Sequence, residues 1–173
     1  FMRGGKGVLT RDVKTMITLL VDVEIARYAK LNLKAIFLHD VITDLILGWD
    51  MPEVLQLFYD HVKNKYDTVP AFCTKNLPLL METLDTLGIE NPLIMASVNK
   101  AGYQVNPSLP AFEECLRTRK LRLLAMSTLA AGYLKPAEAY DYLYGLPRVE
   151  SVVVGVSRKE HAAETFGEIK KHL

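Results

Sequence analysis

The segment LNLKAIFLHD, residues 31–40, is a short apolar run that ends at a histidine and an aspartate. Its apolar residues are adjacent rather than spaced with a helical period, which predicts a strand at residues 33–39. Similar apolar runs occupy residues 69–74, 92–98, 121–127 and 150–157. None alternates strictly between apolar and polar residues. Continuous runs of this kind are typical of strands buried on both faces of a parallel sheet.

Capping residues mark the starts of helices between these runs. Asp50 with Glu53, and Ser157 with Glu160, have the three-residue spacing of a capping box. Asn76 precedes another helical stretch and is expected to be its N-cap. These signals predict that each strand is followed by at least one helix.

Prolines and a glycine mark further helix ends. Pro110 and Pro136 suit the first turn of a helix, and Gly88 suits the position just after one. Residues 11–30 also predict a helix, whose apolar face comprises Val13, Ile17, Leu20 and Val21. The order is therefore one helix followed by five strand–helix units, an α/β pattern found in barrels and doubly wound sheets.

Size and composition place the chain among ordinary globular proteins. It has 173 residues, which predicts a single domain spanning residues 1–173. The net charge of +1 gives no global attraction for nucleic acid or an anionic membrane. The densest basic cluster, residues 117–122, is explained by its place near a helix C-terminus. Half of the residues are hydrophobic, and this apolar composition favours association with a partner.

The N-terminus and the cysteines suggest a cytoplasmic protein. Basic residues at the N-terminus are not followed by an apolar region, so no signal peptide is expected. Phe1 before Met2 resembles the remainder of an expression tag, and RGGKG at residues 3–7 lacks the spacing of a phosphate-binding loop. Cys73 and Cys115 form neither a C-x-x-C motif nor a metal-ligand spacing, so no metal site is expected. A reducing cytoplasm suits two unpaired cysteines.

Three segments carry a family resemblance. LNLKAIFLHD is similar to the fourth strand of the aldo-keto reductase family, where a run such as DLYLIH ends in the catalytic histidine. RLLAMSTLAAGYL, residues 122–134, resembles that family's seventh strand and its SPL.G loop. VESVVVGVSRKEHAAETF, residues 149–166, resembles the eighth strand and the helix after it. The resemblance spans about residues 20–173 and implies strands four to eight of a (β/α) TIM-type barrel: a partial barrel of about five parallel strands with flanking helices, N-terminal helix first.

The resemblance also implies which part of the family's chemistry is missing. The family reduces carbonyl groups with NADP(H) through an aspartate, a tyrosine, a lysine and a histidine, and three of these follow strands that have no counterpart here. Only His39 matches the tetrad, and Asp40 follows it. His39 is therefore either an acid–base group or an inherited residue hydrogen-bonded to Asp40 or a backbone carbonyl.

Several residues are candidates for contacts with a cofactor or anion. A helix N-terminus attracts anions. In the family, the turn that corresponds to residues 155–160 holds the adenosine phosphate of the cofactor. The candidates in this turn are Gly155, Ser157, Arg158 and Lys159. Ser127 and Gly132 would border the same ligand, and the resemblance adds Asn76 and Asn99. The alternatives are structural: an ordinary capped helix, a tight loop of small residues, and a plain N-cap at Asn76.

Two functions follow from these expectations. The first is a self-associating partial barrel without reductase activity that requires no cofactor and retains a phosphate or nucleotide site, NADP being the nucleotide implied. Five strands cannot close an eight-stranded barrel, so a homo-oligomer, either a dimer or a tetramer, would cover the open edges. The second is an NADP(H)-dependent oxidoreductase whose site is assembled between chains, with Tyr103 or Lys75 joining His39 and Asp40. A third interpretation is that the chain is a fragment of a longer barrel.

Overall fold

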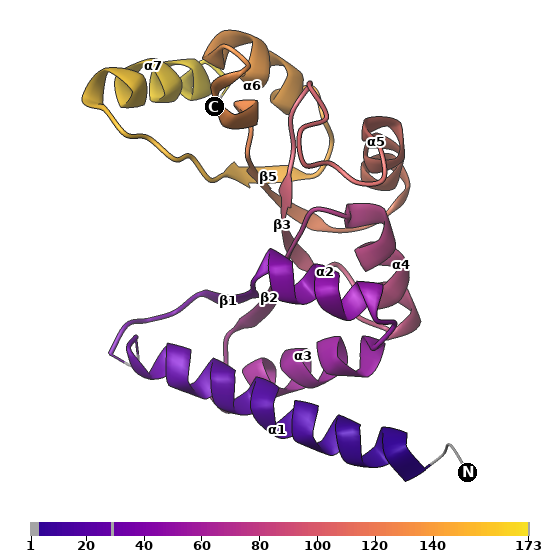
Figure 1. The fold of residues 1–173 in the computed structure, drawn as a ribbon. Helices are drawn as coiled ribbons and strands as arrows, with labels where there is room; N and C mark the ends of the chain where they lie inside the picture. Colours follow the sequence, from indigo (N-terminus) through magenta and orange to yellow (C-terminus); the bar gives the residue numbers. More distant parts are fainter. Residues whose placement is uncertain (1–3, 29, 173) are drawn as a thin grey trace.

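The computed structural model describes residues 4–28 and 30–172, with side chains from Thr15 onward (Figure 1). The expectations for Phe1, Met2 and Val13, and part of that for residues 3–7, lie outside what is described. Five parallel strands form one sheet in the order β1-β2-β3-β4-β5. Their bounds are Ala35–Leu38 (β1), Val69–Thr74 (β2), Leu93–Ser97 (β3), Arg122–Met126 (β4) and Val149–Val152 (β5).

Helices precede the sheet and connect its strands. Within the described residues they are α1 (Gly4–Ala26), α2 (Asp40–Gly48), α3 (Pro52–Tyr66), α4 (Leu77–Thr86), α5 (Leu109–Thr118), η1 (Ala130–Gly132), α6 (Pro136–Tyr144) and α7 (Lys159–Lys170). The predicted α/β class, with five parallel strands and a helix first, is confirmed. Parallel strands that neighbour each other in chain order need crossovers of one hand, which bring the connecting helices to one face. The arrangement is compatible with part of a (β/α) barrel.

The two faces of the sheet are covered unequally. Phe72, Ile94 and Leu123 lie side by side on β2, β3 and β4, and all three are 0% exposed. The next row on the opposite face is only half-buried; it comprises Cys73, Met95 and Leu124. Because the helices of a barrel lie outside its strands, the half-buried face corresponds to the interior of a closed barrel.

Helix α1 packs against α3. Val21 and Ile25 are buried, and Ile17 packs partly buried against the same core. Leu20, predicted on this face, is 46% exposed. The packed face is therefore rotated about the helix axis from the predicted one, because α3 contacts Ile17, Val21 and Ile25, which are spaced four residues apart.

A carboxylate also joins α1 to α3. Asp22 accepts hydrogen bonds from Lys65 Nζ at 2.6 Å and Tyr66 Oη at 2.5 Å, and lies 2.7 Å from His61 Nε2. The bonds from Lys65 and Tyr66 lower the pKa of Asp22 well below its usual range. Burial and the nearby carboxylate raise the pKa of Tyr66 to about 12. No helix in the described part of the chain is long and apolar enough to cross a membrane.

Two helix starts and one strand end differ from the predictions. Helix α3 begins at Pro52 after Met51, because Asp50 adopts a left-handed φ of 53° and does not cap it. Helix α7 begins after Arg158 without a side-chain cap, so Ser157 lies one residue before the N-cap position. Strand β5 ends at Val152 rather than at residue 157, since its partner β4 ends at Met126.

The expected ends of α4 are confirmed. Asn76 caps it, its Oδ1 accepting a hydrogen bond from the Leu79 amide at 3.3 Å. Gly88 follows the helix with a φ of 70°, the left-handed conformation that glycine adopts without a steric cost.

Candidate functional site

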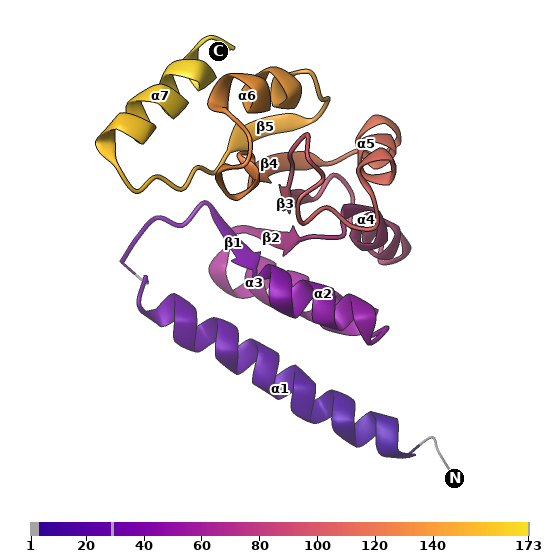
Figure 2. The same ribbon diagram turned by 45° about the horizontal axis from the view of Figure 1, so that its top comes forward.

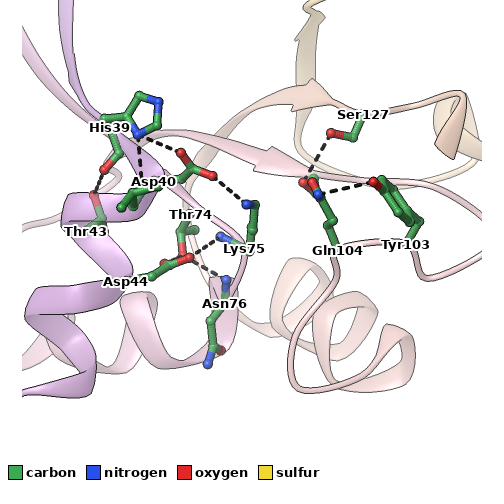
Figure 3. A network of polar contacts seen from close by, with 12 residues as sticks. His39, Asp40, Thr43, Asp44, Thr74, Lys75, Asn76, Tyr103, Gln104 and Ser127 are labelled. Atoms are coloured by element: carbon green, nitrogen blue, oxygen red, sulfur yellow. Dashed lines mark hydrogen bonds and ion pairs between the residues drawn. The ribbon is translucent and has the colours of Figure 1, made fainter. Parts of the chain in front are cut away.

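The C-terminal ends of β1 and β2 carry a polar network (Figure 3). His39 is the N-cap of α2: its Nδ1 accepts a hydrogen bond from the Val41 amide at 3.2 Å and lies 2.8 Å from Asp40 Oδ1. One nitrogen cannot accept from Val41 and donate to Asp40 at the same time. The Nδ1 atom therefore caps the helix when it carries no hydrogen and donates to Asp40 when it carries one. The His39 side chain is 71% exposed.

Asp40 also pairs with a lysine from the next strand end. Lys75 Nζ lies 3.1 Å from Asp40 Oδ2. Burial raises the pKa of Asp40, but Lys75, then His39 and the Val41 amide outweigh it, so the pKa is lowered overall. Asp40 is thus held as a carboxylate beside the Lys75 ammonium.

A second aspartate belongs to the same network, in the corner formed by the C-terminal ends of β1 and β2. Asp44 accepts hydrogen bonds from Thr74 Oγ1 at 2.6 Å and from the Lys75 amide at 3.1 Å. Thr74, fully buried, accepts in turn from the Asn76 amide at 2.8 Å. Burial, followed by Asp40 and Asp44, raises the pKa of the neighbouring Cys73 thiol to about 12. Cys73 is consequently a protonated thiol rather than a nucleophile.

Asn99, two residues after β3, holds two loops together through hydrogen bonds. It is 1% exposed. Its Nδ2 donates to the carbonyls of Tyr103 at 2.8 Å and Ser127 at 3.3 Å, and its Oδ1 accepts from the Tyr103 amide at 2.7 Å. The amide predicted to contact a cofactor therefore bonds to the protein's own backbone.

A cleft of about 770 Å³ lies beyond the ends of β4 and β5. Four residues predicted to bind a cofactor line it; they are Ser127, Gly132, Gly155 and Ser157. Its volume falls within the 300–1,000 Å³ typical of small-molecule sites. Arg158, Lys159, Asn76 and Asn99 do not line it. A Cβ atom at Gly155 would meet no protein atom within 4 Å, so its backbone is open to a ligand.

The loop after β4 enters the cleft in a costly conformation. Ser127, Ala130 and Ala131 have left-handed φ values of 56°, 48° and 56°, followed by Gly132 at 88°. Left-handed backbone at residues other than glycine costs about 1–3 kcal/mol each and is concentrated at ligand clamps and active sites. Small residues predicted a tight loop, but nothing in the local sequence indicated left-handed alanines.

Residues on α7 complete the cleft but were not predicted. His161, Glu164 and Thr165 line it. The spacing of His161 and Thr165, four residues apart on the helix after the predicted anion turn, was an available signal. The cleft is therefore mixed in charge, because both Lys135 and Glu164 line it.

No protein-family model, curated protein or solved structure matches the chain. The aldo-keto reductase resemblance therefore stays an expectation that rests on the three sequence segments.

The basic cluster at residues 117–122 is largely neutralised: Arg117 pairs with Glu114, Arg119 with Asp85, and Arg122 with Glu150.

Proposed function

We propose that the chain is a self-associating, aldo-keto-reductase-like partial barrel that binds a phosphate-bearing nucleotide, NADP(H) first, without reducing carbonyl compounds. The observation that carries this proposal is the cleft beyond β4 and β5, where Ser127, Gly132, Gly155 and Ser157 meet. Two hydroxyls and two exposed glycine backbones suit a phosphate and a sugar. We place the protein in the cytoplasm, since Cys73 and Cys115 are both unpaired.

The electrostatics at one wall of the cleft favour an anion. Helix α7 is 12 residues long and begins next to Ser157, so its positive dipole end faces this wall. Arg158 and Lys159 add charge at the same helix start, outside the lining. A phosphate near Ser157 would lie within reach of these cations.

Direct titration with NADPH tests the ligand. Gly155→Ala adds a Cβ that would meet no protein atom within 4 Å, so it should weaken binding at least tenfold while leaving the unfolding midpoint unchanged. Gly167→Ala, on α7 but outside the lining, is the matched control and should bind as the wild type does. Arg158→Ala should weaken binding by about 1–3 kcal/mol, the range for one hydrogen bond to a charged group. Equal affinity in all three variants would contradict the proposal.

The absence of reductase activity follows from what the resemblance leaves out. A single acid–base group contributes about 10²–10⁴-fold to a rate, and the family's tyrosine and lysine have no counterpart here. A steady-state assay with NADPH and a panel of aldehydes should give no turnover above background.

The second candidate is an NADP(H)-dependent oxidoreductase whose active site is assembled between copies of the chain. The contacts that link the side chains of His39, Asp40 and Lys75 favour it. It predicts turnover that His39→Ala abolishes. That result would replace the binding proposal with the enzymatic one.

Self-association is supported by apolar surface that the chain leaves open. The row on the inner sheet face is only half-buried, and Val153 and Val156 after β5 are 44% and 43% exposed. At about 25 cal/mol per Å², a few hundred Å² of exposed apolar surface represents several kcal/mol of unused burial. Sedimentation equilibrium should show a homo-oligomer, a dimer or a tetramer. A folded monomer of 19.5 kDa at every concentration would refute it.

A further inference from the structure

Helix α1 has two apolar faces, of which α3 covers only one. The covered face carries Val21 and Ile25. The other carries four large apolar residues; Met16 is 68% exposed, Leu19 60%, Leu20 46% and Val23 52%. Their spacing of three and four residues places them in one line along the helix, which we call the outer stripe. A helix with apolar residues on opposite faces is expected to pack against two neighbours.

The outer stripe is self-complementary in sequence. A two-fold axis passing between residues 19 and 20, perpendicular to the helix, would place Met16 opposite Val23 of a second copy. The same axis places Leu19 opposite Leu20. A two-fold interface requires one patch to match itself in this way. Figure 2 shows α1 as the outermost element on its side of the molecule, which leaves room for another helix.

The charges along the helix favour the antiparallel direction. The sequence has aspartate at position 12 and arginine at position 27, one turn beyond the two ends of the stripe. Antiparallel pairing about the same axis brings position 12 opposite position 27, so residues of unlike charge occupy matching positions. Parallel pairing would match residues of like charge at both ends.

A second exposed stripe, on α2 and at its C-cap, consists of Val41, Leu45 and Trp49. It has no residues of opposite charge at matching positions beyond its ends: Asp40 and Asp50 are both acidic, and Asp40 already pairs with Lys75 within the chain.

We propose that two copies of this chain associate through antiparallel packing of their α1 helices along the outer stripe. This rests on the self-association proposed above and names its surface. The partner is a second copy because the stripe matches itself in both shape and charge.

Sedimentation equilibrium on matched variants tests the surface. Leu19→Glu places a charge at the centre of the stripe and should raise the dissociation constant at least a hundredfold. Leu45→Glu, at a leucine on α2 that is 45% exposed against 60% for Leu19, should leave it unchanged. Circular dichroism checks that both variants fold. A wild-type oligomer unaffected by Leu19→Glu, or dissociated by Leu45→Glu, overturns the α1 interface and leaves self-association standing. A wild-type monomer overturns both.

Disulfide trapping tests the direction. Met16→Cys and Val23→Cys are prepared separately and mixed under mild oxidation. Antiparallel packing aligns residue 16 with residue 23 of the other copy, whereas two copies of residue 16 lie about 10 Å apart along the axis. A disulfide requires Cα atoms within about 7 Å. Cross-linking in the mixture but not in either variant alone is expected. Cross-linking of Met16→Cys alone would indicate parallel packing and overturn the proposal.

Discussion

Two corners at the C-terminal edge of the sheet differ in how their polar groups are used. At β1–β2, the side chains of Asp40 and Asp44 already have cationic or hydrogen-bonding partners within the chain. At β4–β5, hydroxyls and glycine backbones surround an open cleft of about 770 Å³. The corner with the apparent catalytic residues is internally satisfied, and the corner with small residues has room for a ligand. Polar residue type alone therefore does not show where a ligand has room to fit.

Removing Asp44 should have the largest effect on stability, because it leaves a buried hydroxyl without its hydrogen-bond acceptor. Asp44→Ala leaves the fully buried Thr74 without the acceptor that lies 2.6 Å from its Oγ1. We expect a loss of about 1–3 kcal/mol in the free energy of unfolding. Urea denaturation measures it, with Asp44→Asn, which keeps an acceptor oxygen, as the milder control. Equal stability of the alanine variant would mean that this corner does not depend on its internal bonds.

The strained loop at the other corner should respond in opposite directions to two glycine exchanges. Gly132→Ala places a Cβ at a φ of 88° and should destabilise the fold by about 1 kcal/mol. Ala131→Gly relieves a left-handed alanine and should stabilise it by up to about 1 kcal/mol. Thermal unfolding of the two variants measures the expected destabilisation and the expected stabilisation in one experiment. If neither variant changes stability, the left-handed backbone carries no strain.

Breaking the Asp40–Lys75 ion pair should lower the stability at neutral pH slightly and weaken its dependence on acid. The lowered pKa of Asp40 means that its charge stabilises the fold fully above the unfolded-state pKa of about 3.9. That contribution is lost as the pH falls through the lower folded-state pKa. Lys75→Met removes the main opposing cation, so burial prevails and the pKa of Asp40 rises.

Two measurements check this shift. An NMR titration of the Asp40 carboxyl should show the raised pKa, and the free energy of unfolding should fall less between neutral and acid pH than in the wild type, because Asp40 no longer contributes a stabilising charge that acid removes. The effect at pH 7 should stay below about 1 kcal/mol, because Lys75 is 33% exposed. An unchanged titration of Asp40 would show that the ion pair does not form in solution.

The smallest effect concerns the thiol beside this corner. With a pKa of about 12, Cys73 should react with iodoacetamide far more slowly than free cysteine at pH 8. Asp40→Asn and Asp44→Asn each remove a neighbouring negative charge and should speed the reaction slightly. Cys115, whose pKa burial raises to about 11, serves as the internal reference. Fast labelling of Cys73 would show that the corner opens readily.

Much of the fold could be predicted from local patterns. Four of the five apolar runs contain a strand, and the fifth overlaps β5 at residues 150–152, because a sheet packed against helices selects apolar residues. The cap at Asn76 and the turn at Gly88 depend only on neighbouring backbone groups, so they too were predicted from a few residues. Asp50 and Ser157 have the right spacing for caps, but the path of the chain into α3 and α7 placed other residues at the N-cap.

The sequence by itself determined the parallel α/β class, the order of the elements, and which residues stand at the C-terminal ends of the strands. The tertiary structure alone decided which of those residues meet. Ser127 and Gly155 line one cleft, Lys75 reaches Asp40 across 35 positions, and Asn99 turns to the backbone. The reason is physical: capping and burial are set within a few residues, whereas charge pairing and open space depend on how separate strand ends come together.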